Sequence, residues 1–190
     1  SAIGLVTVNS AHLDASLHFS LAVTDADGDA TATQVLDVSI VGGTTFNGGA
    51  DNEAIQGTSG NDTLNGGAGN DTLTGGLGKD TLNGGDGNDV YDFNAVAESP
   101  AGANKDVVSG FVSGADKIDL SGIDAITGNG ATNDAFTYLG SAAFGNVAGQ
   151  LRFDVATNTL QGDVDGNGVA DFEVQLVGVA VAPLAADIIV

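Results

Sequence analysis

Acidic side chains recur at every ninth position in the middle of the chain. Within residues 48–92, the sixth place of each nine-residue unit holds a carboxylate, namely Glu53, Asp62, Asp71, Asp80 and Asp89. Carboxylates are hard oxygen ligands of the kind that divalent cations such as calcium prefer. Glycines fill most of the first, second and fourth places, where they permit tight turns and leave backbone carbonyls uncovered by side chains. The spacing therefore predicts a row of cation-binding turns.

Each unit also carries one apolar residue two places after the carboxylate. These residues are Ile55, Leu64, Leu73, Leu82 and Tyr91. Nine residues can form a turn and a very short strand with one inward side chain, so that two units make a coil and successive coils lie roughly 4.8 Å apart. Asp62 and Asp80 would then form one column, and the other would hold Glu53, Asp71 and Asp89. Carboxylates this close repel unless a cation lies between them. The alternative is a Gly- and Asp-rich disordered linker, which this composition favours when calcium is absent.

The net charge of −21, from 4 basic and 25 acidic residues, limits the partners of the chain. Nucleic acid and anionic membranes are excluded as expected partners, because contacts with phosphate need Lys and Arg. The sequence has no apolar run of membrane-spanning length, so we expect no direct membrane insertion. It also has no cysteine, which excludes a disulfide framework and a Cys-based metal site. Such a chain is expected to stay soluble and loosely folded until divalent cations arrive.

The N-terminal part of the chain is predicted to form a β-hairpin. Residues 17–23 and 32–40 alternate apolar and polar side chains on either side of an Asp- and Gly-rich turn. The stretch LAVTDADGDATATQVLDVSI resembles the closing strands of Ig-like repeats in large bacterial RTX (repeats-in-toxin) adhesins. Because an isolated hairpin is marginally stable, residues 1–43 either belong to a truncated Ig-like domain or dock on the rest of the chain. Asp25, Asp27 and Asp29 could bind calcium or form a solvated turn, and both interpretations stay open.

The nine-residue pattern, G-G-x-G-x-D-x-U-x, resembles the calcium-binding repeat of RTX proteins. Residues 106–125, which include ADKIDLS, and the following tail resemble the C-terminal β-domain of serralysin-type proteases. That family usually has Asp where this chain has Gly110, which leaves Asp106 as the candidate calcium ligand of the segment. The resemblance implies an all-β fold, with a short parallel β-roll at 44–93 joined to an antiparallel, β-sandwich-like domain at 94–190.

The resemblance also implies which residues would bind calcium. In RTX proteins one ion is held by places two, four and six of one turn and by places one, three and six of the turn one coil later. Only the sixth place contributes its side chain, and the other places contribute carbonyl oxygens. The first implied site comprises Thr58, Gly60, Asp62, Gly75, Leu77 and Asp80. The second comprises Gly67, Gly69, Asp71, Gly84, Asp86 and Asp89. A third, weaker site comprises Gly49, Asp51, Glu53, Gly66, Ala68 and Asp71. Six oxygens suit calcium better than magnesium, which requires shorter and stricter geometry.

Residues 163–171 have the spacing D-x-D-x-N-G-x-x-D, which matches the first nine positions of an EF-hand loop. The calcium ligands would be Asp163, Asp165, Asn167 and Asp171. Val174 stands at place twelve, where an EF-hand has a bidentate Glu, and no helical pattern flanks the loop. A calcium site of reduced strength and a plain β-turn both remain open.

No H-E-x-x-H or G-x-S-x-G motif occurs, so we predict no enzymatic activity for this chain. The RTX resemblance implies an extracellular or cell-surface protein of a Gram-negative bacterium, exported by a type I secretion transporter. The ending DIIV at 187–190 looks like the uncleaved secretion signal of serralysins. The hairpin favours the C-terminal module of a large adhesin of unknown target, and the alternative is the tail of a secreted hydrolase such as a metalloprotease or lipase.

Overall fold

A computed structural model of the chain describes residues 20–21, 34–35, 44–130, 133–179 and 181–190. Their strands are β1 Ser20–Leu21, β2 Gln34–Val35, β3 Thr45–Asn47, β4 Ala54–Gln56, β5 Thr63–Ala68, β6 Thr72–Thr74, β7 Thr81–Asp86, β8 Val90–Asp92, β9 Asp106–Ser109, β10 Lys117–Asp119, β11 Thr137–Tyr138, β12 Gln150–Asp154, β13 Thr159–Asp163, β14 Phe172–Val177 and β15 Ile188–Ile189. Two short 3-10 helices, η1 Val96–Glu98 and η2 Ala185–Asp187, complete the regular structure of these residues. The predicted all-β class is confirmed. None of the described helices is long and apolar enough to cross a membrane.

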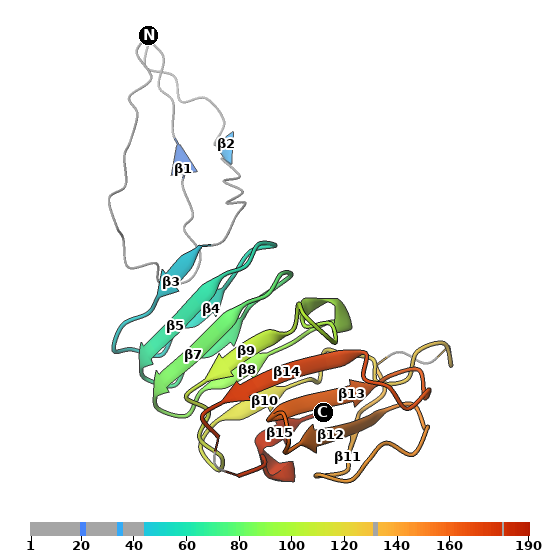
Figure 1. The fold of residues 1–190 in the computed structure, drawn as a ribbon. Helices are drawn as coiled ribbons and strands as arrows, with labels where there is room; N and C mark the ends of the chain where they lie inside the picture. The colour runs from blue at the N-terminus through green and yellow to red at the C-terminus, as the bar shows by residue number, and fades with distance from the viewer. Residues whose placement is uncertain (1–19, 22–33, 36–43, 131–132, 180) are drawn as a thin grey trace, which may run out of the picture.

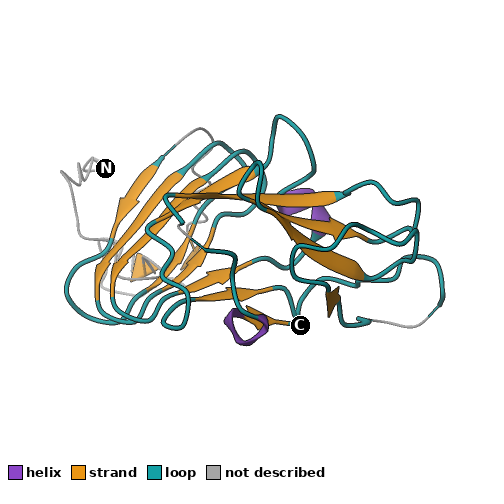
Figure 2. Cartoon of the chain, turned by 60° about the horizontal axis from the view of Figure 1, so that its bottom comes forward, coloured by secondary structure: helices purple, strands orange, loops and turns teal. Residues whose placement is uncertain are grey.

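Two main sheets face each other along the molecule (Figures 1 and 2). One has eight strands in the order β11-β12-β13-β14-β9-β7-β5-β3, and the other has five in the order β15-β10-β8-β6-β4. Strands that follow each other in the repeats alternate between the sheets, as expected when one coil consists of two nine-residue units. The parallel β-roll is thereby confirmed.

The register of the roll follows from the repeat length. Thr63 pairs with Thr81, and Thr72 pairs with Val90, so each strand lies on the strand 18 residues later. This register turns the one apolar residue of each unit into the space between the sheets. Leu64, Leu73, Leu82 and Tyr91 are fully buried there, and Ile55 is 5% exposed. The side chains that alternate with them point to the outer faces of the sheets.

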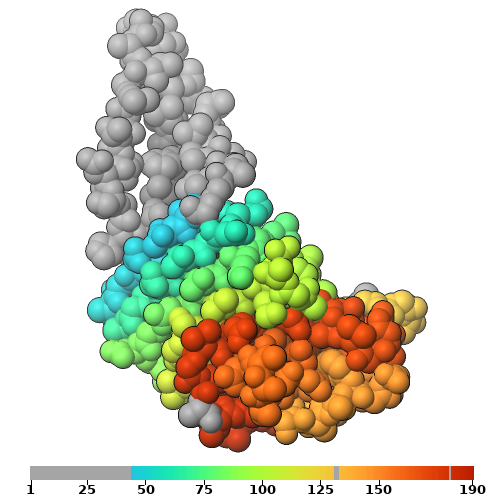
Figure 3. Space-filling model, in the orientation of Figure 1, coloured from blue at the N-terminus to red at the C-terminus, as the bar shows by residue number. Residues whose placement is uncertain are grey.

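Both sheets continue past the last repeat without interruption. β9 pairs in parallel with β7, and β10 pairs in parallel with β8. β14 and β15 then add to β9 and β10, again in parallel. Figure 3 shows the coils as successive coloured bands, with the C-terminal strands packed directly on the last of them. Residues 44–93 and 94–190 therefore share their sheets and one hydrophobic core.

The antiparallel strands predicted in the C-terminal part are β12, β13 and β14. The hairpin of β12 and β13 turns at residues 155–158, with Asn158 in the left-handed region at φ 51°. The inward residues of this sheet include Phe153 and Phe172, which are 1% and 0% exposed. β12 ends at Asp154, and Val155 in the turn that follows is 61% exposed. β9, β10, β11 and β15 differ from the antiparallel expectation, since they pair in parallel.

The N-terminal hairpin is described only where its two strands meet. β1 pairs with β2 in antiparallel fashion, with Ser20 opposite Val35, which agrees with the predicted pairing. The predicted turn with Asp25, Asp27 and Asp29, and the remainder of residues 1–43, lie outside the described residues.

Candidate metal centre

The sixth-place carboxylates stack in two columns, as the repeat pattern predicts. The backbone N–H of each such residue donates to Oδ1 of the carboxylate in the next coil. These distances are 2.8 Å from Glu53 to Asp71, 2.9 Å from Asp71 to Asp89 and 2.7 Å from Asp62 to Asp80. One oxygen of Asp71, of Asp80 and of Asp89 thus accepts a hydrogen bond that holds successive coils together.

The second oxygens of the inner carboxylates have no partner. Oδ2 of Asp71, of Asp80 and of Asp89 is buried without a hydrogen bond. Leaving a charged oxygen dry and unpaired costs several kcal/mol unless a cation or donor compensates it. The first carboxylates of the columns differ, since Glu53 accepts the N–H of Gly49 (3.0 Å) and Asp62 accepts the N–H of Thr58 (2.6 Å).

Glycines at the first place of the repeats bring backbone carbonyls against these oxygens. A Cβ on Gly66 would collide both with Oδ2 of Asp71 and with the carbonyl oxygen of Gly84, so these two oxygens lie close together. In the same way, the carbonyl oxygen of Gly75 lies near the carboxylate of Asp62, and the carbonyl oxygen of Gly66 lies near the carboxylate of Glu53. One such pair belongs to each of the three predicted sites. The donors are all oxygens, so the residues present fit calcium.

The other predicted backbone ligands lie between coils as well. The carbonyl oxygens of the second and fourth places face glycines of the next coil, and they belong to Gly49, Asp51, Thr58, Gly60, Gly67 and Gly69. Among the third places, Asp86 O accepts the N–H of Gly69 in the preceding coil at 2.9 Å. The third-place residues Ala68 and Leu77 would also contribute carbonyls, and the side chain of Leu77 is half-exposed.

Both columns extend beyond the repeats. Asp80 N–H donates to Oδ1 of Asp106 (2.7 Å), the residue singled out in the sequence. Asp89 N–H donates to Oδ1 of Asp116 (3.0 Å), which the sequence analysis missed. Oδ2 of Asp116 accepts the N–H of Val112 (2.8 Å). Gly114 is the sequence feature that could have identified Asp116. It stands two places before Asp116, and the fourth-place glycines of the repeats stand two places before the repeat carboxylates.

Burial alters the proton affinity of this cluster. The pKa of Asp80 is raised to about 6 and the pKa of Asp106 to about 8, mainly by desolvation and in part by the neighbouring carboxylates, Asp62 for Asp80 and Asp80 for Asp106. Desolvation is also the main cause that raises the pKa of Asp89. Backbone N–H donors oppose these shifts without cancelling them.

Without calcium, we expect mild acid to stabilise the fold around Asp80 and Asp106. Their folded pKa values lie above the ordinary value of 3.8. The stabilisation by bound protons is therefore full below about pH 4 and is lost as the pH rises through about 6 and then about 8. Far-UV circular dichroism of chelating-resin-treated protein should show more β-structure at about pH 5.5 than at about pH 8.5. An equal or weaker β-signal in acid would contradict this expectation.

The loop between β13 and β14 gathers three of its four predicted ligands. Carboxylate oxygens of Asp163, Asp165 and Asp171 lie within 4.8 Å of one another. The loop also satisfies much of its own hydrogen bonding, as in a tight turn. Asp163 accepts the N–H groups of Gly166 (2.7 Å) and Gly168 (2.8 Å). Asn167, the fourth predicted ligand, donates its side-chain amide to Asp165 (2.8 Å). Both interpretations of this loop are compatible with the geometry.

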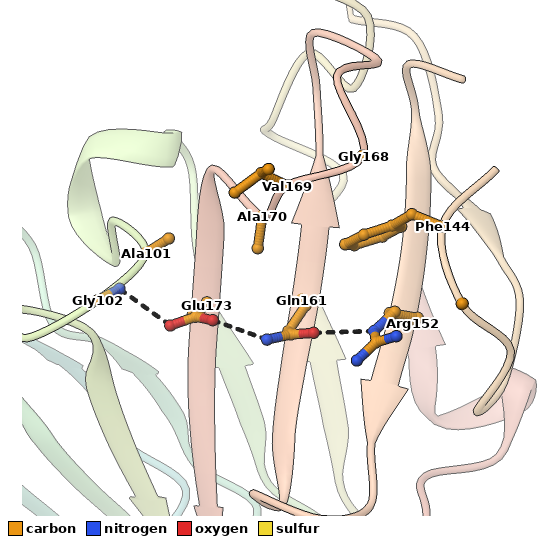
Figure 4. A pocket seen from close by; sticks show the side chains of 10 residues that line it. Ala101, Gly102, Phe144, Arg152, Gln161, Gly168, Val169, Ala170 and Glu173 are labelled. Atoms are coloured by element: carbon orange, nitrogen blue, oxygen red, sulfur yellow. Dashed lines mark hydrogen bonds between the residues drawn. The ribbon is translucent and has the colours of Figure 1, made fainter. Parts of the chain in front are cut away.

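A shallow groove crosses the outer face of β12, β13 and β14 (Figure 4). Its floor is a chain of cross-strand hydrogen bonds, from Arg152 to Gln161 (2.8 Å) and from Gln161 to Glu173 (2.7 Å). Glu173 also pairs with Lys105 (3.0 Å), and Arg152 lies 5.4 Å from the centre of the Phe144 ring. Arg152 and Glu173 are therefore both engaged by neighbouring side chains, and the residues that line the groove include no nucleophile–base pair. Among the described residues, the buried carboxylates with an unpaired oxygen lie instead in the roll and at Asp106 in β9.

Comparison with known proteins agrees with this architecture. The family described as Peptidase M10 serralysin C terminal matches residues 32–190. Metallopeptidase AprA of Pseudomonas marginalis is 48% identical over 149 residues, which are 76% of this chain and 30% of that protein. The chain thus spans less than a third of the length of that relative. The solution structure of the AlgE6R3 subunit from the Azotobacter vinelandii mannuronan C5-epimerase superposes with a TM-score of 0.53 at 28% identity, covering 78% of each chain. The chain belongs to the family of serralysin C-terminal domains and carries an RTX-repeat β-roll.

Proposed function

We propose that the chain is a non-catalytic module that folds when it meets extracellular calcium and that forms the C-terminal end of a larger secreted protein. The observation that carries this proposal is the set of buried, unpaired Oδ2 atoms of Asp71, Asp80 and Asp89. Oδ2 of Asp71 lies near the carbonyl oxygen of Gly84 in the next coil, and a divalent cation would replace the missing partner of such an oxygen. The proposed ligands are the three six-residue sets of the roll, and the loop at 163–171 is a further candidate site.

Calorimetric titration of the chelated chain tests this proposal. We expect at least three calcium ions to bind per chain, with folding of the chain contributing to the measured heat. Parallel titration with magnesium should give little binding, because magnesium releases its waters reluctantly and requires shorter and stricter distances to its oxygen ligands than calcium does. A chain that binds no calcium at millimolar concentration would rule out the proposed function.

The proposal includes a type I secretion signal at residues 187–190. In the folded chain this ending is part of the structure, since β15 pairs in parallel with β10. Asp187 is buried, where it accepts hydrogen bonds from Ser113 Oγ (2.6 Å) and Gly114 N (3.0 Å) and lies 3.6 Å from Lys117 Nζ. A transporter could read the signal while the chain is unfolded in the calcium-poor cytosol.

Deletion of residues 187–190 should reduce export by a cell that carries a matching type I transporter. The purified variant should still bind calcium, because β15 lies at the end of its sheet away from the repeats. Export would be measured as the fraction of the chain in the medium. Substitution of the partly exposed Ile189 by Ala is the control for loss of packing at this edge. Export equal to that of the intact chain would exclude the assignment of the signal.

Two kinds of parent protein are compatible with this module. An adhesin is favoured by the hairpin sequence at 17–40, and a secreted metalloprotease is favoured by the 48% identity to metallopeptidase AprA. The sequence of the few hundred residues upstream distinguishes them. Tandem Ig-like repeats would identify the adhesin, whereas an H-E-x-x-H motif would identify the protease.

A further inference from the structure

Three neighbouring strands of the eight-stranded sheet carry the dipeptide Asn-Gly at the same place (Figure 1). The pairs are Asn47–Gly48 at the end of β3, Asn65–Gly66 within β5 and Asn83–Gly84 within β7. In the parallel register Asn47 lies beside Asn65, and Asn65 lies beside Asn83. At the equivalent place of the five-stranded sheet, β4 ends with Gln56 and β6 ends with Thr74. The three Asn-Gly pairs therefore form one column in one sheet.

An Asn-Gly pair can convert its own amide to a carboxylate, because asparagine is a chemically labile residue. The backbone nitrogen of the glycine forms a bond to Cγ of the asparagine, and the C–N bond of the side-chain amide breaks. The proton of that backbone nitrogen leaves with the amide group as ammonia. Water then opens the resulting cyclic imide at one of its two C–N bonds, which gives either aspartate or isoaspartate. A following glycine has no Cβ to hinder the attack.

The roll requires the glycines of these pairs. A Cβ on Gly48 would collide with the carbonyl oxygen of Gly66, and a Cβ on Gly66 would collide with that of Gly84. The asparagines contribute to the contact between coils, since the side-chain amide of Asn65 donates to Oδ1 of Asn47 (2.8 Å). The reactive dipeptide is therefore part of how this sheet is built.

The folded roll keeps the reacting nitrogen and carbon apart. Side chains of a strand stand roughly perpendicular to the sheet, whereas backbone N–H groups point toward a neighbouring strand. The nitrogen of Gly48 donates to the carbonyl of Asn65 (2.7 Å). The nitrogen of Gly84 donates to the phenol oxygen of Tyr91 (3.0 Å). Gly66 lies inside β5, which pairs with β7 on either side of it. Each reaction would therefore first require the roll to open.

We propose that Asn47, Asn65 and Asn83 are deamidation sites that the folded roll protects and that become reactive when the chain loses calcium. This inference rests on the proposed calcium-dependent folding and adds a covalent change that returning calcium does not reverse. Aspartates at these places would lie in register on neighbouring strands, where like charges repel. Isoaspartate would also lengthen the backbone by one methylene and disturb the register of the strands. The time that a chain spends without calcium therefore limits the fraction that can fold again.

Two further Asn-Gly pairs lie outside the roll, and one of them is an internal control. Asn167–Gly168 belongs to the loop at 163–171, which is itself a candidate calcium site. Asn129–Gly130 lies between β10 and β11, and both of its residues are exposed. Asn129 should therefore convert at a similar rate with and without calcium.

Peptide mass spectrometry of the chain, incubated at mildly alkaline pH, tests the proposal. One sample contains saturating calcium, a second contains chelator, and a third contains chelator and urea. Conversion of Asn65 and Asn83 should be at least about tenfold faster in chelator than in calcium, because the reaction no longer requires opening of the fold. When calcium is returned to the chelated sample, the β-signal recovered in circular dichroism should fall as conversion proceeds.

The matched control is a variant with Asn47→Gln, Asn65→Gln and Asn83→Gln together. Glutamine keeps the amide but would have to close a larger and less favourable ring. Gln56 already occupies the equivalent place at the end of β4, so a glutamine side chain fits there. After incubation in chelator, this variant should recover its β-signal when calcium returns. Loss of recovery equal to that of the intact chain would exclude deamidation as the cause.

The outcomes separate the inference from the proposed function. Equal rates of conversion in calcium and in chelator, in a chain whose β-signal chelator abolishes, overturn the inference while the proposed function stands. If chelator leaves the β-signal unchanged, the proposed function fails, and the sample with urea then tests protection by the fold. Faster conversion of Asn65 and Asn83 in urea supports that protection, and an equal rate overturns it.

Discussion

Removal of calcium should unfold the roll at 44–93, and calcium, but not magnesium, should restore it. The stacked carboxylates repel one another when no cation separates them, and the chain as a whole carries a net charge of −21. A site occupied at 100 times its dissociation constant adds about 2.7 kcal/mol, so three sites add about 8 kcal/mol. This is comparable with the whole stability of a small domain, which is about 5–15 kcal/mol.

Far-UV circular dichroism provides the measurement. In chelator the β-signal should fall mostly to that of disordered chain, and millimolar calcium should recover it. The same concentration of magnesium controls for screening of charge, because it supplies an equal ionic strength without fitting the sites. A chelated sample that keeps its full β-signal would show that the sheets are stable without the ion.

Asp71→Asn should raise the calcium midpoint of folding roughly tenfold or more, corresponding to about 1.4 kcal/mol. Asp71 lies inside its column, with Glu53 in the coil before it and Asp89 in the coil after it. Its buried, unpaired Oδ2 would thus serve ions on both sides, and the substitution removes this oxygen while Oδ1 still accepts the Glu53 N–H. Asp62 is the first carboxylate of the other column, so Asp62→Asn should cause a smaller shift.

A calcium titration of both variants at fixed ionic strength compares these effects. The Asp71 variant should also show reduced cooperativity, since neighbouring coils stabilise each other in stacked repeats. Asp119→Asn controls for the loss of one negative charge and should leave the midpoint near that of the intact chain. Equal midpoints for the Asp71 and Asp62 variants would mean that adjacent sites do not share a carboxylate.

The roll could be predicted from the sequence because its geometry is periodic. A fixed spacing of nine residues determines the 18-residue register, and the register alone places Asp62 on Asp80 and Asp71 on Asp89. Glycines at fixed places form the turns between the strands. A residue with a Cβ at such a place would collide with a carbonyl of the neighbouring coil. Few tertiary contacts are needed to infer such a structure.

The continuation of the columns could not be predicted in the same way. Asp106 and Asp116 lie 26 and 27 residues after the carboxylates they stack on, rather than 18. The segment between the last repeat and Asp106 contains η1 and the bridge from Pro100 to Phe172, so its length is set by contacts with a distant strand. For the same reason the sequence predicted only antiparallel strands at 94–190, whereas β9, β10 and β15 pair in parallel and continue the sheets of the roll.

The stacking of coils also determines how the module responds to mechanical tension. The chain enters at the end of the stack formed by β3 and β4, and the strands lie across the direction in which coils are added (Figure 1). A pulling force applied to the upstream chain therefore peels one strand at a time instead of shearing a whole sheet. Each detached coil releases 18 residues, or roughly 60 Å of extended chain. The roll would lengthen in steps under load, and every step would break one layer of inter-coil bonds.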